Sequence, residues 1–254
     1  MKYLPNFSHI YIERSAREYP LTHTILKRFK RSLQIELDDY KRIFARPRQD
    51  WREQKRSQKL ILAVKKSDFL YEAGEVQPHF EGGGSYYAAL AMNCPFDCEY
   101  CFLQGMYPSA NLVVFVNFDD YENAILAKLE SEGTFNLALS YTTDLLAIEQ
   151  IASYCESSVL LASRNPALNL ELRTKSTNIK ALLKLRPVEN VTIAWTLSPD
   201  TVAKSYERGA PALKARLRAI SQVQLAGWKV RLCFDPLIAV DNWQEVYTEF
   251  LSEV

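Results

Sequence analysis

The chain has 254 residues, 48% of them hydrophobic and 24% charged, and its formal net charge is +1. That length and apolar content suffice for one globular domain with a well-buried core. A net charge near zero excludes a general attraction to nucleic acid or an acidic membrane, so such a partner must be bound by a local patch. No apolar run approaches the roughly 18 residues of a membrane span, and residues 1–20 lack a signal-peptide pattern, so we expect a soluble, cytoplasmic protein without a membrane partner.

The N-terminal region is expected to be a small α/β extension over residues 1–84. Residues 22–37, THTILKRFKRSLQIEL, carry an amphipathic helical pattern. Residues 59–66, KLILAVKK, indicate a short strand, and EGGGS at 81–85 indicates a turn.

A basic stretch lies inside this extension. Residues 41–59 hold eight Lys or Arg residues against two acidic ones. One interpretation is a solvated linker. The other is a phosphate-binding patch for DNA, in which Phe44 and Trp51 stack on bases.

Short apolar runs alternate with helical stretches from residue 86 onward. The runs are typical of buried strands and cover 86–93, 135–140, 168–174, 191–197 and 230–235. The amphipathic stretches between them cover 119–133, 145–157, 178–185 and 210–227. Gly133 and Gly227 stand where a helix C-terminus favours positive φ. Repeated strand–helix units predict a parallel sheet, and five of them predict a partial (β/α) barrel over 85–254 with its active site at the carboxyl ends of the strands.

Three of the five cysteines lie within MNCPFDCEYCFLQG, residues 92–105. Thiols stay reduced in the cytosol, so clustered cysteines indicate metal or redox chemistry. Cys94, Cys98 and Cys101 follow the first expected barrel strand, and their spacing lets one loop surround a compact metal centre. Structural zinc takes four protein ligands and an iron–sulfur cube normally takes four cysteines. Either a distant ligand completes the set, or one metal position is open.

The other cysteines and the histidines give little support to a complete set of protein ligands. Cys155 and Cys233 are expected in a helix and a strand, as small buried thiols. His9, His23 and His79 all precede the cluster, and none stands at ligand spacing. An open position on a [4Fe–4S] cluster is therefore the favoured interpretation.

The segment CPFDCEYC, followed by an aromatic residue, resembles the cluster motif of the radical S-adenosylmethionine (SAM) superfamily. Other segments resemble, in the same order, the spore photoproduct lyase family of DNA-repair enzymes: YIERSAREYPL, CFLQG, VNFDDYENAI, YTTDLLAIE, RTKS, AKSYERGAP, ALKARLRAI and AGWKVRLCFDPLIAVDNWQEVY. The resemblance covers nearly the whole chain from about Tyr11. The cysteine spacing specifies the superfamily, whereas the family depends on the combined weaker motifs.

The resemblance implies a fold, two cofactors and a reaction. The fold is a partial barrel of radical SAM type. Cys94, Cys98 and Cys101 would hold three irons of a [4Fe–4S] cluster, and SAM would chelate the fourth. Electrons from a reductant such as flavodoxin or ferredoxin would cleave SAM to a 5′-deoxyadenosyl radical, which abstracts hydrogen from a thymine-dimer-type DNA lesion or a related substrate. The enzyme would be a carbon–carbon lyase whose protein part binds, orients and excludes water.

The resemblance also assigns single residues, each with an ordinary alternative. Thr143 and Asp144 match a Ser–Asp pair near bound SAM, although both types are favoured helix N-caps. Lys175 matches a lysine that pairs with the SAM carboxylate, or it is a solvated charge at a strand end. Thr196 matches a serine near the SAM ribose, or it is a β-branched strand residue. Tyr100 matches a tyrosine beside SAM, or it serves packing.

The sequence departs from the family at its hydrogen donor and at its C-terminus. Tyr141 stands where the family has a cysteine that returns a hydrogen atom to the product, and Phe102 stands where the family has a tyrosine. A phenolic O–H can also yield a hydrogen atom, so Tyr141 is either a substitute donor or a sign of a different substrate. The chain ends with an expected helix at 242–254 after five barrel strands, so we expect a barrel without its last strand.

The sequence is also compatible with a second function, that of a binding protein that is not an enzyme. The chain would then be a non-catalytic module derived from the same family, with cysteines that hold zinc and a basic stretch that binds nucleic acid. Metal content discriminates the two functions, because an iron–sulfur cluster absorbs visible light and zinc does not.

Overall fold

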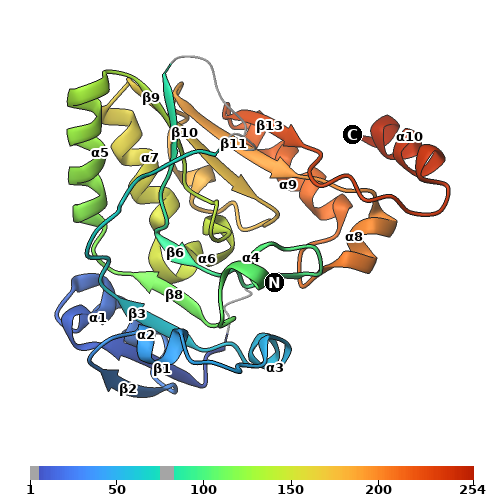
Figure 1. Ribbon diagram of the computed structural model, residues 1–254. Coiled ribbons are helices and arrows are strands. Elements are labelled where there is room, and N and C mark those ends of the chain that lie inside the picture. Colours follow the sequence, from blue (N-terminus) through green and yellow to red (C-terminus); the bar gives the residue numbers. More distant parts are fainter. Residues whose placement is uncertain (1–5, 75–82) are drawn as a thin grey trace.

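The computed structural model describes residues 6–74 and 83–254, which form two main sheets. In Figure 1 the smaller, N-terminal sheet lies below the larger one. His79 and residues 81 and 82 of the expected turn lie outside the described residues.

The N-terminal sheet has five strands in the order β2-β1-β3-β8-β6. They are β1 (His9–Glu13), β2 (Leu33–Leu37), β3 (Leu60–Ala63), β8 (Leu112–Phe115) and β6 (Ala91–Met92). Neighbouring strands are parallel except β6 and β8. The short helices of this region are η1 (Arg14–Ala16), α1 (Pro20–Arg28), α2 (Lys41–Phe44) and α3 (Trp51–Arg56). β3 and β8 are buried throughout, which explains their continuous apolar sequences.

The larger sheet has six strands in the order β13-β11-β10-β9-β5-β4. They are β4 (Tyr71–Glu72), β5 (Gly84–Tyr87), β9 (Phe135–Ala138), β10 (Leu168–Thr174), β11 (Val191–Thr196) and β13 (Lys229–Cys233). All neighbouring strands are parallel except β4 and β5. The carboxyl ends of β9, β10, β11 and β13 therefore meet at one edge of the sheet.

Helices connect and cover these strands. They are α5 (Phe118–Glu132), α6 (Leu145–Ala152), α7 (Tyr154–Arg164), η2 (Leu182–Lys184), α8 (Asp200–Tyr206), α9 (Leu213–Leu225) and α10 (Trp243–Glu253). α6 and α7 pack against β10, and α9 packs against β13. Among the described residues no single helix is long and apolar enough to cross a membrane, and only α6 and α7 taken together, bent by 98°, meet that length and composition.

The mixed α/β class with parallel sheets is confirmed. Four of the five expected barrel strands correspond to β9, β10, β11 and β13, and β3 lies inside the strand expected at 59–66. The partial barrel, its absent last strand and the domain division at residue 84 stay predictions. β6 and β8 come from beyond residue 84 and complete the N-terminal sheet.

The expectation of one strand over residues 86–93 was wrong. β5 ends at Tyr87, and the chain then crosses to the other sheet, where it forms β6. The backbone polar groups of the crossing segment are paired on both sides: Ala88 N–H donates to the Ala138 carbonyl, and Phe115 N–H donates to the Leu90 carbonyl. Four small or apolar residues in a row, 88–91, fit this buried crossing.

Three expected helices also differ. The helix expected at 22–37 stops at Arg28, and 33–37 forms β2 because apolar residues alternate there with strand periodicity and pair with β1. The stretch 178–185 forms only the short η2, since Arg186 and Pro187 follow and the residue before a proline disfavours helix. The stretch 145–157 is split, because Ser153 adopts a left-handed φ of 52°.

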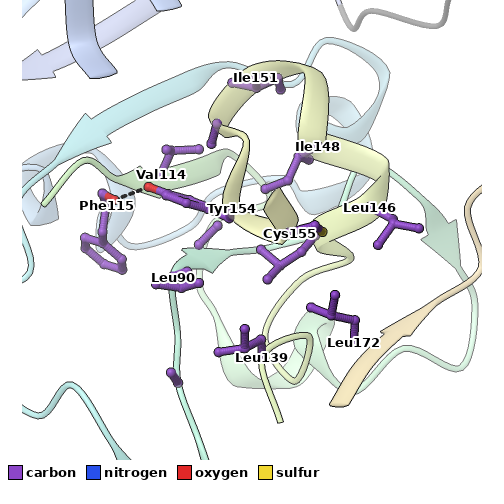
Figure 2. Close-up of a cluster of buried hydrophobic side chains, with 14 of the residues drawn as sticks. Leu90, Val114, Phe115, Leu139, Leu146, Ile148, Ile151, Tyr154, Cys155 and Leu172 are labelled. Carbon is purple, nitrogen blue, oxygen red and sulfur yellow. Dashed lines mark hydrogen bonds between the residues drawn. The ribbon is translucent and has the colours of Figure 1, made fainter. Parts of the chain in front are cut away.

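Tyr154 ties the helices of the larger sheet to the N-terminal sheet. It begins α7 and is fully buried, and its hydroxyl donates to the carbonyl of Phe115 at the end of β8. Figure 2 shows this bond among side chains from both regions, including Leu90, Val114 and Leu172. The two sheets therefore share one hydrophobic core.

Replacing Tyr154 by Phe should lower the free energy of unfolding by about 0.5–1.5 kcal/mol, the usual net value of one hydrogen bond. Urea denaturation followed by circular dichroism measures the loss. Tyr11→Phe, at a half-buried tyrosine on β1, is the matched control. Equal stability of the Tyr154 variant and the parent would show that the bond does not hold the sheets together.

Candidate radical SAM active site

One cavity is lined by all the residues predicted to hold the cluster, bind SAM or act in catalysis. It has a volume of about 330 Å³ and lies at the carboxyl ends of β9, β10 and β11. The predicted site residues that line it are Cys94, Cys98, Tyr100, Cys101, Tyr141, Thr143, Asp144, Lys175 and Thr196. Their positions in one cavity are a finding of the structure, whereas the role of each residue stays a prediction.

The start of the cysteine loop is fixed by the N-terminal region. Asn93 adopts a left-handed φ of 68°, and its buried Nδ2 donates to the Ser109 and Asn111 carbonyls, both at 2.7 Å. Lys55 on α3 donates from Nζ to the carbonyl of Cys94 at 2.5 Å and to that of Phe96 at 2.6 Å. The loop therefore turns away from β6 at Asn93 and is held there by a lysine of the basic stretch.

The basic stretch thus differs in part from what its sequence indicated. Phe44 is buried in the core, so the expectation that it stacks on bases was wrong. Trp51 is half-buried, and Lys55 lies 5.7 Å from its ring centroid. The remaining exposed cations are Lys41, Arg42, Arg46, Arg48, Arg52 and Arg56. Apolar anchoring of Phe44 by the core explains why an aromatic residue stands in a charged segment.

The middle of the cysteine loop pairs with a second short strand. β7 (Asp97–Cys98) is antiparallel to β12 (Glu207–Arg208), with Cys98 opposite Glu207. Glu99 N–H donates to the Tyr206 carbonyl at 2.8 Å, and Arg208 forms an ion pair with Glu99 at the surface. The backbone of the loop is therefore fixed by β12 as well.

A buried ion pair stands behind this pairing. Arg216 on α9 contacts Glu207, and both side chains are almost fully buried. Glu207 also accepts from the Tyr100 hydroxyl and, at 3.2 Å, from Ser198 Oγ. Arg216 donates to the Thr196 carbonyl at 3.1 Å. Burial alone would raise the pKa of Glu207, but the charge of Arg216 and the hydrogen bond from Tyr100 hold that pKa below its usual value.

Sequence reasoning missed Glu207 and Arg216. Both lie in segments that carried the family resemblance, AKSYERGAP and ALKARLRAI, but no chemistry was assigned to them. A buried Glu–Arg pair leaves no local sequence signal, because its two members are nine positions apart on different elements. The one available indication was that Glu207 lies inside a segment that resembles the family.

Burial keeps the Cys94 and Cys98 thiols of the cysteine loop in the protonated form. Burial raises the pKa of Cys94 far above its usual value, although the charge of Lys55 acts to lower it. Burial also raises the pKa of Cys98, to about 11, although the charge of Lys175 acts to lower it. Without a bound metal these thiols keep their protons, so binding must release them. Within residues 6–74 and 83–254, no three His, Cys, Asp or Glu side chains converge as ligands of a single ion would.

Asp144 has the capping role that its residue type favours. Its Oδ1 accepts from Ala147 N–H at 3.0 Å and so caps α6, and it accepts from Thr174 Oγ1 at 2.7 Å. Its Oδ2 accepts from Lys175 N–H at 2.7 Å. Burial raises the pKa of this carboxyl. Asp144 therefore joins the start of α6 to the end of β10 at the wall of the cavity.

Two buried hydroxyls in the cavity wall have no partner within the described chain. They are Thr143 Oγ1, beside the α6 cap, and Ser140 Oγ, after β9. Burying a polar group without a hydrogen bond costs free energy, so in native structures such a group is normally hydrogen-bonded to protein, water or a ligand. These two hydroxyls indicate that the cavity is built for a polar ligand. Ser140 was not predicted, because it reads simply as the last residue of an apolar strand.

The other predicted residues complete the wall. Lys175 follows β10, and its Nζ lies 5.5 Å from the ring centroid of Tyr100. Thr196 ends β11 and is buried. The centroid of the Tyr141 ring lies 5.2 Å from that of the Phe102 ring, so these two aromatic residues meet in the cavity.

A loop with three cysteines spaced Cys-x3-Cys-x2-Cys, set over a cavity at the carboxyl ends of parallel strands, is the arrangement of a radical SAM enzyme. Comparison with known proteins narrows this class. The family model for spore photoproduct lyase matches residues 3–254. The chain belongs to the spore photoproduct lyase family, a family of radical SAM lyases, and the resemblance seen in the motifs is confirmed.

Relatives in this family are distant but match nearly the whole chain. The spore photoproduct lyase of Clostridium acetobutylicum is 22% identical over 97% of this chain and 73% of its own length. That of Bacillus subtilis is 23% identical over 96% of this chain and 72% of its own.

Solved structures show the same fold. A spore photoproduct lyase complexed with dinucleoside spore photoproduct has a TM-score of 0.86 at 20% identity, covering 100% of this chain and 74% of that one. A spore photoproduct lyase mutant with bound AdoMet and dinucleoside spore photoproduct has a TM-score of 0.85 at 20% identity, covering 98% of this chain and 74% of that one.

Replacing Arg216 by Met should destabilise the protein by about 3–5 kcal/mol, because it leaves Glu207 buried without its counter-charge. Arg208→Ala, which removes the exposed pair with Glu99, is the matched control and should cost no more than about 1 kcal/mol. Urea denaturation of both variants measures the difference. Similar losses in the two variants would mean that the buried pair does not hold the loop.

Proposed function

We propose that this chain is a radical SAM lyase that acts on a thymine-dimer-type DNA lesion or a related substrate. The observation that carries the proposal is the single cavity that gathers the three cysteines and every residue assigned to SAM. When bound, the [4Fe–4S] cluster and SAM supply a 5′-deoxyadenosyl radical that abstracts hydrogen from the substrate. The residues of this chain bind, orient and shield those groups.

The donor set fits the cluster. Cys94, Cys98 and Cys101 would each hold one iron, on a loop fixed from one side by Lys55 and from the other by the pairing of β7 with β12. Three protein thiolates leave one iron for a small-molecule ligand, since a [4Fe–4S] cluster has four such positions. The loop is therefore rigid where the ligands sit and open toward the cavity.

The cavity wall fits SAM. Lys175 offers the ammonium that a carboxylate needs, and Thr143 offers an unpartnered buried hydroxyl. Asp144 caps α6, so it would act on SAM mainly by holding Thr143 and Lys175 in place. Thr196 would lie near the ribose. The Tyr100 ring beneath Lys175 restrains that side chain by a cation–π contact.

The family supports a nucleic-acid lesion as substrate. Three of the solved relatives contain dinucleoside spore photoproduct. The exposed cations of the basic stretch would contact DNA phosphates, and a flavodoxin or ferredoxin would supply electrons. Phe102 and Tyr141 would face the lesion from the cavity rim, where the family has a tyrosine and a cysteine.

Anaerobic reconstitution of the full chain should incorporate about four iron and four sulfide, as a [4Fe–4S] centre requires. Cys98→Ala should abolish this, because it removes the middle thiolate. Cys155→Ala, at a buried thiol on α7, is the matched control and should keep the cluster. Stoichiometric zinc with no iron uptake by the parent would instead favour the non-catalytic module.

Lys175→Ala should weaken SAM binding by about 1.5–3 kcal/mol, the range of a charge-assisted hydrogen bond, and leave the iron content unchanged. Isothermal titration of the reconstituted protein with SAM measures the affinity. Lys204→Ala, which removes an exposed lysine of α8, is the control. An affinity equal to that of the parent would return Lys175 to the role of a solvated charge.

Tyr141→Phe should spare SAM binding and SAM cleavage but divert substrate radicals to side products, because the ring remains and only the phenolic hydrogen is lost. Chromatography and mass spectrometry of a dinucleoside spore photoproduct reaction give the product distribution. Tyr141→Cys should restore ordinary repair. An unchanged distribution in the Phe variant would leave Tyr141 as a packing residue.

A further inference from the structure

Four aromatic rings form a continuous column that begins in the active-site cavity. The column consists of Phe102, Tyr141, Tyr87 and Tyr71. Ring centroids are separated by 5.2 Å between Phe102 and Tyr141, by 4.5 Å between Tyr141 and Tyr87, and by 4.9 Å between Tyr87 and Tyr71. At these separations neighbouring rings are in contact.

The column joins two cavities. Phe102 and Tyr141 line the active-site cavity. Tyr71, on the edge strand β4, lines a second cavity of about 300 Å³ that also contains Lys65 and residues of the N-terminal sheet. The Tyr71 hydroxyl accepts a hydrogen bond from Lys65 Nζ at 2.6 Å. Tyr87 on β5 lies between the two ends and lines neither cavity.

We propose that Tyr141, Tyr87 and Tyr71 form a relay that carries a hydrogen-atom equivalent from the second cavity to the active site. The relay rests on the proposed function, in which Tyr141 gives a hydrogen atom to a substrate radical. It adds two residues, Tyr87 and Tyr71, that do not line the active-site cavity, and it assigns a use to the second cavity.

Each step of the relay balances. The Tyr141 O–H bond breaks, and its hydrogen atom forms a C–H bond on the substrate radical. Tyr87 then gives one electron and one proton to the Tyr141 phenoxyl radical, and Tyr71 restores Tyr87 in the same way. A one-electron donor of the thiol class reduces the Tyr71 radical, which takes a proton from water in the second cavity. The net transfer is one electron and one proton from solution to substrate.

The chemistry of the column favours a relay over packing alone. A Phe ring would pack as well as a Tyr ring and has no hydroxyl to desolvate, yet three successive rings of the column belong to Tyr. Burial, and then the phenols of Tyr141 and Tyr71, raise the pKa of Tyr87, so this phenol keeps the hydrogen that the relay needs. The ammonium of Lys65 disfavours a positive charge on Tyr71, so oxidation there must release the proton together with the electron.

Site-specific photo-oxidation of the full-length apoprotein tests the relay. Lys66 is exposed and lines the second cavity, and its replacement by p-azidophenylalanine allows an alkyne-bearing ruthenium photo-oxidant to be attached beside Tyr71. Tyr141 is replaced by 3-aminotyrosine, which traps an oxidising equivalent as a stable radical. Electron paramagnetic resonance after a flash in the presence of a quencher measures the yield at the far end of the column.

The relay predicts a trapped radical at position 141. Its yield should fall by about tenfold or more when Tyr87→Phe is added, because oxidation of a phenyl ring is much harder than oxidation of a phenol. A tenfold change in rate corresponds to about 1.4 kcal/mol in activation free energy. Tyr11→Phe, at a half-buried tyrosine on β1 outside the column, should leave the yield unchanged. Circular dichroism checks that Tyr87→Phe is folded, and Tyr71→Phe gives an independent break in the same path.

Three results would overturn the relay. The first is no radical at position 141 in the parent. The second is a radical yield in Tyr87→Phe and in Tyr71→Phe that equals the yield in the parent, and the third is a loss of yield in Tyr11→Phe as large as that in Tyr87→Phe. The measurement uses no iron, SAM or substrate. Failure of cluster assembly or of SAM cleavage would therefore overturn the proposed function without changing this result, and the two failures are distinguishable.

Discussion

The buried ion pair between Arg216 and Glu207 is the constraint on which the site depends. Glu207 pairs through its backbone with Cys98 and through its carboxylate with Tyr100, while Arg216 reaches the carbonyl of Thr196 at the end of β11. One charged pair thus fixes the cysteine loop, the cavity residue Tyr100 and the end of β11 relative to one another. Because each charge would be costly alone in this interior, the three positions are coupled.

The opposite side of the loop is fixed by the N-terminal sheet. Lys55 and Gln58 both donate to the carbonyl of Cys94. The chain crosses between the sheets immediately before the cysteines, so neither sheet alone could position them. Anchoring from both sides fixes the backbone of the cysteine loop, and Thr143 and Ser140, whose buried hydroxyls have no partner within the described residues, line the same cavity. A cluster and a polar cofactor fit this arrangement.

Much of this arrangement was predictable from the sequence, and the rest depends on contacts between distant segments. The apolar runs that became β9 and β10, and the spacing of the cysteines, are local patterns that physical chemistry interprets directly. β8 and β6 pair with the N-terminal sheet rather than with their neighbours in sequence. Lys55 was one of eight cations in the basic stretch, and Glu207 was part of a family-like segment to which no chemistry was assigned. Their roles follow from burial and long-range pairing, which no local pattern encodes.

The most direct measurement is the formation of 5′-deoxyadenosine from SAM by the reconstituted and reduced 254-residue chain, with the Cys98→Ala variant as the blank. The account predicts 5′-deoxyadenosine from the parent and none above background from the variant. A parent protein that holds its cluster and binds SAM, yet forms no more 5′-deoxyadenosine than Cys98→Ala, would contradict it.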